Sequence, residues 1–161
     1  MFKRLLSTRP ELSSLILRLC GGVVMFPHGA QKLLGWFGGS GYAATMKGLS
    51  EGMGLPSVIV FLVIVLEFFG GLFLIAGFLT RLFALGLSVI MFFSIYLVHW
   101  PQGFFMNWFG KMEAGQEGFE YHILAIAVYL ALVLKGGGLL SVDRALSLRE
   151  QEKRADESEE D

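Results

Sequence analysis

The chain has 161 residues, of which 54% are hydrophobic, with a formal net charge of −1 and a mean hydropathy of +0.61. A soluble domain is less apolar than this, and the balanced charge with an acidic C-terminal segment excludes a basic surface that would bind nucleic acid. Because the chain contains a single cysteine, Cys20, it cannot form an intrachain disulfide or carry out paired-thiol chemistry by itself.

Four apolar segments dominate the chain, and each reaches or approaches the length of a membrane-spanning helix. About 20 apolar residues are needed to cross about 30 Å of hydrocarbon, so the shortest segment, the fourth, would have to stand nearly upright. The segments cover residues 12–34, 56–79, 82–100 and 119–134. We therefore expect an all-α fold, a four-helix transmembrane bundle of up-down topology that forms one membrane domain over residues 1–146.

The distribution of Lys and Arg predicts how the chain is oriented. These residues gather before the first segment, at Arg81 between the second and third, and after the fourth, whereas the loops on the other side hold only Lys47 and Lys111. By the positive-inside rule, both termini are cytoplasmic in a multi-pass protein of the plasma (inner) membrane. The first segment is expected to be an uncleaved helix, because Arg18 interrupts the apolar run that a signal peptide requires.

The connections between the segments also carry predictions. The turn at residues 80–81 is so short that the second and third helices should be neighbours. In the first outer loop, residues 42–53 have the pattern of a short amphipathic helix. The aromatic residues of 103–110 indicate either an interfacial belt or a lid over a substrate site. Glycines at 136–138 should stop the fourth helix, and residues 147–161 form a charged tail expected to be disordered and cytoplasmic.

Ionisable residues inside the first two segments suggest a buried ion pair. On a helical projection, Arg18 shares one face of the first segment with several glycines, and Glu67 shares a face of the second with Gly70 and Gly71. These faces are expected to pack together, because glycine allows close approach. We expect Arg18 and Glu67 to pair, with His28 as the outer neighbour. The pair would be functional or would simply hold the helices in register.

A second group of ionisable and polar residues falls in the outer third of the bundle. Its members are His28, Lys32, His99, Glu120, Tyr121 and His122. Imidazole, ammonium, carboxylate and phenol groups around one outward-facing pocket could bind a carbonyl compound and move protons to it, which suits the head group of a quinone. No metal site is expected, because no HExxH or CxxCH pattern occurs. The GxGxxA pattern at 39–44 lacks the βαβ context of a dinucleotide site.

The order and spacing of these residues resemble those of the DoxX family. The resemblance is carried by Arg18, Gly22, His28-Gly29-x-x-Lys32, Phe37-Gly38-Gly39, Gly54-x-Pro56, Glu67-x-x-Gly70-Gly71-x-x-Leu74-x-x-Gly77, Gly103-Phe104-Phe105, Glu120-Tyr121 and Gly138-x-x-Ser141-x-Asp143-Arg144. It implies a four-helix inner-membrane protein. The family is named after the membrane subunit of a thiosulfate:quinone oxidoreductase, and relatives are linked to thiol oxidative stress and to quinone tolerance.

Two hypotheses about function follow. In the first, the protein is a redox-associated module, such as a subunit of a quinone-linked oxidoreductase, that binds a quinone and works with a soluble or membrane redox partner. In the second, it is a non-enzymatic membrane scaffold or partner subunit whose buried charges are structural. Membrane lipid and further copies of the chain in a homo-oligomer are the other partners that we consider. The candidate quinone-binding residues are Arg18, His28, Lys32, Glu67, His99, Glu120, Tyr121 and His122.

Overall fold

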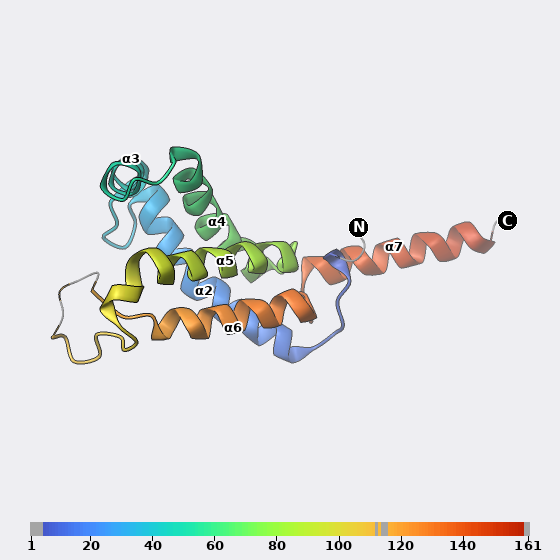
Figure 1. The fold of residues 1–161 in the computed structure, drawn as a ribbon. Coiled ribbons are helices and arrows are strands. Elements are labelled where there is room, and N and C mark those ends of the chain that lie inside the picture. The colour runs from blue at the N-terminus through green and yellow to red at the C-terminus, as the bar shows by residue number, and fades with distance from the viewer. Residues whose placement is uncertain (1–4, 112, 114–115, 160–161) are drawn as a thin grey trace.

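The protein is a bundle of α-helices in the computed structural model, which describes residues 5–111, 113 and 116–159 (Figure 1). The predicted all-α class is confirmed. The elements are α2 (Leu12–Leu34), α3 (Gly41–Lys47), the π-helical η1 (Gly48–Gly52), α4 (Ser57–Ala76), α5 (Thr80–Ser94), the π-helical η2 (Ile95–His99), the short 3-10 helix η3 (Trp100–Gln102), α6 (Glu120–Lys135) and α7 (Val142–Glu159).

Three of the described helices are long and apolar enough to cross a membrane. They are α2, α4 and the continuous helical stretch Thr80–Gln102, which joins α5 to η2 and η3. The fourth predicted segment forms α6, which has 16 residues and is shorter than these three. The fold is therefore a helical membrane bundle with three long candidate spans.

The four main helices follow one another around the bundle. Helix α2 packs against α4 and α6, and α5 packs against the same two helices, so the neighbour expected for α5 across the short turn is confirmed. The core between them contains Met25, Leu74, Leu87 and Tyr129. Many large apolar side chains face outward instead, such as Val58 at 66% exposure, as expected of a surface that contacts lipid.

The tightest packing lies between the glycine-containing faces of α2 and α4, as the sequence predicts. A Cβ atom added to Gly22 would lie 2.7 Å from the carbonyl oxygen of Gly71, and one added to Gly29 would lie 2.3 Å from the backbone nitrogen of Phe68. No side chain fits at these distances, so the two backbones are in direct contact. This contact sets which residues of α2 and α4 face each other.

At the end of the bundle where α4 and α5 meet, Asp143 of α7 caps the start of α5. Its carboxylate oxygens accept hydrogen bonds from the backbone N–H groups of Leu79 (2.7 Å) and Thr80 (2.9 Å), and its own N–H donates to the carbonyl of Gly77 at 2.9 Å. An anion at a helix N-terminus satisfies unpaired N–H groups and interacts favourably with the helix dipole. The cap thus ties α7 to the turn between α4 and α5.

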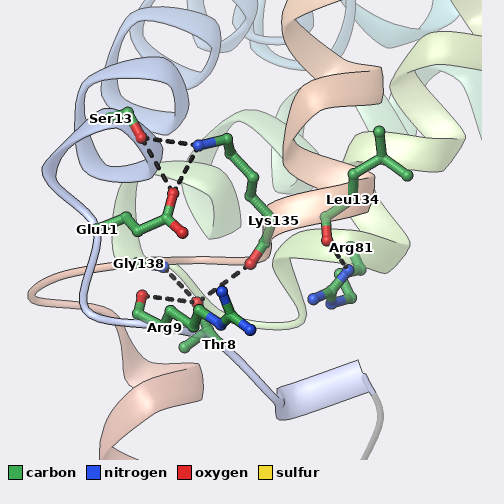
Figure 2. A network of polar contacts seen from close by, with 8 residues as sticks. All are labelled: Thr8, Arg9, Glu11, Ser13, Arg81, Leu134, Lys135 and Gly138. Carbon is green, nitrogen blue, oxygen red and sulfur yellow. Dashed lines mark hydrogen bonds and ion pairs between the residues drawn. The ribbon is translucent and has the colours of Figure 1, made fainter.

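A polar network at the same end joins the segment before α2 to the end of α6 (Figure 2). The ammonium of Lys135 lies 2.6 Å from a carboxylate oxygen of Glu11 and 3.1 Å from the hydroxyl oxygen of Ser13. The backbone N–H of Gly138 donates to the hydroxyl of Thr8 at 2.7 Å. The predicted helix stop is also confirmed, because α6 ends at Lys135 and Gly136 adopts φ = 81°.

Two peripheral segments are helical. The short helix expected in the first outer loop is present as α3 and η1. The sequence predicts a disordered tail at 147–161, but the described part of it, residues 147–159, is helical. It belongs to α7, which continues through Glu159 and projects away from the bundle (Figure 1). The tail is rich in helix-favouring Glu, Lys, Arg and Ala, and Lys153 and Glu157 lie 3.8 Å apart at i, i+4, which supports a solvated helix.

Candidate functional site

The end of the bundle opposite the Asp143 cap contains a cavity of about 410 Å³, to which α2, α4, α5, η2, α6 and the loop before α6 all contribute. Cavities that bind small molecules typically measure about 300 to 1,000 Å³. Six of the eight candidate residues line it: His28, Lys32, Glu67, His99, Tyr121 and His122. The structure thus brings together most of the residues that the sequence singled out.

One wall of the cavity is formed by an ion pair between α2 and α4. The ammonium of Lys32 lies 2.5 Å from a carboxylate oxygen of Glu67, whose side chain is 5% exposed, whereas that of Lys32 is 29% exposed. A carboxylate buried in a membrane protein needs a counter-charge or hydrogen-bond donors, and here Lys32 supplies both. The pair therefore presents a cation and an anion side by side to the cavity.

The expected pairing of Arg18 with Glu67 is wrong, and the register of the two helices explains why. The close approach of Gly29 to Phe68 places Glu67 level with residue 29, one helical turn from Lys32. Arg18 is 11 residues earlier on α2, or about 16 Å along the helix axis. The guanidinium therefore cannot reach Glu67, and Lys32 takes the position that the sequence analysis gave to Arg18.

Arg18 instead binds the ends of the surrounding helices. It is 1% exposed, and in the described part of the chain all its hydrogen bonds go to backbone carbonyl oxygens. Its acceptors are Leu74 and Ile75 at the end of α4 and Gly137, Leu139 and Leu140 after α6. Carbonyls at a helix C-terminus carry partial negative charge, so they stabilise a buried cation. Arg18 is a structural clamp and does not line the cavity.

The opposite wall of the cavity contains two adjacent histidines. The ring centroids of His99 and His122 are 4.2 Å apart. Nδ1 of His99 lies 2.6 Å from the carbonyl oxygen of Glu117, and Nε2 of His122 lies 3.2 Å from the hydroxyl oxygen of Ser94. His122 is only 7% exposed, yet its Nδ1 atom has no hydrogen-bond partner among the described residues.

Glu120 has a different position from the one predicted. Its Oε2 atom accepts hydrogen bonds from the backbone N–H of Met106 at 3.2 Å and from the indole N–H of Trp108 at 2.9 Å. It therefore anchors the loop before α6 and does not line the cavity. This loop in turn contributes Met106 and Glu117 to the cavity wall.

Sequence reasoning missed five residues of the cavity wall: Met25, Met91, Ser94, Met106 and Glu117. Met25 lies on the glycine-containing face of α2 and could have been found there. The two loop residues, Met106 and Glu117, carry no local signal, because only the folding of the loop over the bundle brings them to the site. The three methionines provide an apolar, polarisable surface suited to a flat ring.

Three further observations concern the chemistry of this region. Among the described residues, no group of three or more His, Cys, Asp or Glu side chains could hold a metal ion. Cys20 is exposed on α2 and does not line the cavity. A second hollow of about 380 Å³, between α2 and the first outer loop, shares Lys32 with the cavity and is lined also by Gln31, Ser40 and Thr45.

Two known proteins are similar in sequence to this chain. The chain is 36% identical over 115 residues to inner membrane protein YqjF of Escherichia coli (strain K12), covering 70% of this chain and 80% of the relative. It is 26% identical over 133 residues to a protein of Bacillus subtilis (strain 168) named "Putative oxidoreductase CatD", covering 83% and 86% of the two chains. No solved structure gives a significant match.

The relationship to YqjF, together with the long apolar helices, confirms the predicted location in the inner membrane. The model of the DoxX family matches residues 13–100, a range that contains α4, α5, η2 and all of α2 except Leu12, with Lys32, Glu67 and His99. By this match and by its similarity to YqjF, the chain belongs to the DoxX family.

Proposed function

We propose that this DoxX family protein is a redox-associated membrane module that binds a quinone or a similar small carbonyl compound in the cavity of the outer bundle. In this proposal α6 is the fourth membrane span, and both termini lie in the cytoplasm. The observation that carries the proposal is the cavity of about 410 Å³. The Lys32–Glu67 pair lines one side of it, His99 and His122 line the other, and methionines complete the lining.

The groups in the cavity suit a flat ring with oxygen substituents. The ammonium of Lys32 donates hydrogen bonds and would polarise a carbonyl oxygen, and Glu67 holds it in place at 2.5 Å. Tyr121 of α6 also lines the cavity, and Met25 and Met91 offer apolar contact to the faces of a ring. A ligand of this kind matches both the polar and the apolar parts of the cavity.

The relatives support a redox association. The Bacillus subtilis relative, which aligns with 83% of this chain, carries the word oxidoreductase in its name. Electrons would reach a bound quinone from a soluble or membrane partner or from a small reductant, and the protein would act as a subunit of a quinone-linked oxidoreductase. The cavity residues then bind and orient the quinone and supply protons to its oxygens.

Binding of duroquinone tests the proposal, because its fully substituted ring cannot add to thiols or amines. We expect saturable binding to the full-length protein in lipid nanodiscs, corrected for partition into empty nanodiscs, and a higher melting temperature in its presence. The variant Lys32→Met should bind about tenfold more weakly, because it loses a charged hydrogen-bond donor. Lys47→Met, on the exposed surface of α3, is the matched control. Absence of saturable binding to the wild-type protein would contradict the proposal.

A scaffold role is the second candidate, and the arrangement around Arg18 favours it. Within the described residues, the hydrogen bonds of this buried cation go only to backbone carbonyls at the end of α4 and in the segment after α6. A scaffold should co-purify with one fixed partner in constant ratio and should not bind duroquinone. Gentle extraction from the native membrane, followed by mass spectrometry of the retained proteins and quinones, separates the two functions.

A further inference from the structure

Among the described residues, one ring nitrogen of His122 has a hydrogen-bond partner and the other has none. Its Nε2 atom faces the hydroxyl of Ser94 at 3.2 Å, whereas Nδ1 has no partner among the described residues although the side chain is more than nine-tenths buried and lines the cavity. A buried polar atom without a hydrogen bond costs free energy. A ligand in the cavity that reached this nitrogen and supplied a hydrogen bond would remove that cost.

The partner of His122 allows Nδ1 to act as either a donor or an acceptor. If the hydroxyl of Ser94 donates to Nε2, the ring proton is on Nδ1, which then donates to a carbonyl oxygen. If the ring proton is on Nε2, it is donated to the oxygen of Ser94, and Nδ1 accepts from a hydroxyl. In that arrangement the Ser94 proton can turn to the carbonyl four residues earlier in its helix, a common acceptor for helical serine.

The Lys32–Glu67 pair, on the other side of the cavity, can also either donate or accept a hydrogen bond. In the Lys32–Glu67 pair, the ammonium can only donate and the carboxylate can only accept, and both groups line the cavity. A carbonyl oxygen of a ligand would be satisfied by Lys32, and a hydroxyl by Glu67. Both ends of a ring that carries two oxygens can thus be satisfied in either chemical form of those oxygens.

We propose that the Ser94–His122 pair and the Lys32–Glu67 pair make this a site for both the quinone and the hydroquinone form of one ligand, with His122 as the specificity-determining contact. This inference rests on the proposed function and deepens it. It assigns Ser94 and Nδ1 of His122 to recognition of the ligand oxygen. A site of this type would hold its ligand through a change of redox state, whichever partner carries out that change.

Three probes that share one ring test the inference: duroquinone, durohydroquinone under anaerobic conditions, and durene, which lacks the oxygens. We expect the wild-type protein in nanodiscs to bind the first two within about threefold of each other and durene at least tenfold more weakly, the effect of losing about one hydrogen bond. Equal affinity for durene, or binding of the quinone without the hydroquinone, would overturn the inference. Failure of all three probes to bind would instead overturn the proposed function itself.

Variants of His122 test whether this residue contributes to binding of the two probes. His122→Leu should weaken binding of both duroquinone and durohydroquinone about tenfold, whereas His122→Asn, whose side-chain amide reaches the position of Nδ1 and can donate or accept, should restore it. Tyr129→Phe is the control, because Tyr129 lies on the same helix, loses a buried hydrogen bond to the carbonyl of Gly21 and does not line the cavity. Unchanged affinity in His122→Leu would reject the role of His122 and leave quinone binding intact.

A spectroscopic measurement on the wild-type protein covers the case in which His122→Leu does not fold. The ¹⁵N chemical shifts of a histidine ring distinguish a protonated from a bare nitrogen. With duroquinone bound, Nδ1 of His122 should be the protonated nitrogen, and with durohydroquinone bound, Nε2 should be. The same tautomer in both complexes would overturn the inference.

Discussion

The choice of counter-charge for Glu67 decides what the cavity can bind. Because Lys32 and Glu67 are both on the wall, the site presents a cation and an anion at one point and keeps a balanced charge. Had Arg18 taken this role, its planar guanidinium would have bound both carboxylate oxygens. With Lys32 as the partner, one carboxylate oxygen of Glu67 is left outside the ion pair, and the ammonium retains donors for a ligand.

Removing only one charge of this pair should lower the free energy of unfolding more than removing both charges. Lys32→Met leaves a buried carboxylate without its cation and should lower the free energy of unfolding by about 1 to 3 kcal/mol, less than a fully buried pair because Lys32 is partly exposed. The double variant Lys32→Met, Glu67→Leu should recover most of that loss. Unfolding with sodium dodecyl sulfate in mixed micelles measures both values. If the double variant is no more stable than Lys32→Met, the unpaired carboxylate of Glu67 is not the cause of the loss.

Arg18 should matter for stability and not for ligand binding. Arg18→Lys keeps the charge but cannot reach carbonyls of both α4 and the segment after α6, so we expect a loss of about 2 to 4 kcal/mol in the free energy of unfolding. The folded fraction should bind duroquinone within about twofold of the wild type, because the cavity lies at the other end of the bundle. A large loss of duroquinone affinity in well-folded Arg18→Lys would show that Arg18 contributes to the binding site.

At the scale of the elements, the contact between α2 and α4 positions Lys32 against Glu67. It depends on glycines whose missing side chains allow the two backbones to touch. Any change in this contact should therefore alter both the stability of the bundle and the geometry of the cavity.

Gly29→Ala should separate α2 from α4, because its Cβ atom would overlap the backbone of Phe68 at 2.3 Å. Overpacking of this kind costs about 1 to 3 kcal/mol or more, since backbone cannot move aside as a side chain can. Duroquinone affinity should fall as well. The control is Gly86→Ala on α5, where the nearest atoms are the side chain of Leu66 at 3.4 Å, and where alanine should stabilise the helix by up to about 1 kcal/mol. Equal effects of the two substitutions would contradict the proposed backbone contact.

The link between the segment before α2 and the end of α6 should depend on pH. The hydrogen bond and positive charge of Lys135 lower the pKa of Glu11 below its ordinary value of 4.5. Its stabilising contribution is therefore fully present above that value and is lost as the pH falls through the lower pKa of the folded state. Melting temperatures of the wild type and Glu11→Gln should differ at pH 7 and converge near pH 3. A difference that persisted at pH 3 would assign the effect to something other than this ion pair.

At the scale of the whole molecule, the number of membrane crossings fixes where the two termini lie. Three long apolar helices alone would place the termini on opposite sides, whereas α6 as a fourth span returns the C-terminal helix α7 to the side of the N-terminus. The capping of α5 by Asp143 and the clamp of Arg18 on the segment after α6 draw the start of α7 to the same end of the bundle as the start of α2.

Labelling of single cysteines in intact cells tests this topology. In a Cys20→Ser background, a membrane-impermeant maleimide should react with Lys111→Cys, in the loop between η3 and α6. It should not react with Thr8→Cys or Glu150→Cys until the membrane is permeabilised. Labelling of Glu150→Cys from outside, with Thr8→Cys still protected, would show that α6 does not cross the membrane.

The sequence by itself determined the apolar helices and the faces of α2 and α4 that meet. Hydropathy over 20 residues and glycines at helical spacing are local properties, so α2 was predicted with its observed bounds, and its contact with α4 followed from the same pattern. The residues of the outer cluster were also found, because ionisable groups in apolar segments are rare and must turn inward.

Only the tertiary structure decided which of those groups touch. The partner of Glu67 depends on the register of α2 against α4, and a shift of a few residues along two uniform apolar helices leaves hydropathy unchanged. The roles of Glu120 and His122 were likewise open, because positions two residues apart on α6 point in directions about 200° apart, and only packing fixes which one faces the cavity. The contributions of Met106 and Glu117 depend on how a loop closes over the bundle, which no local pattern records.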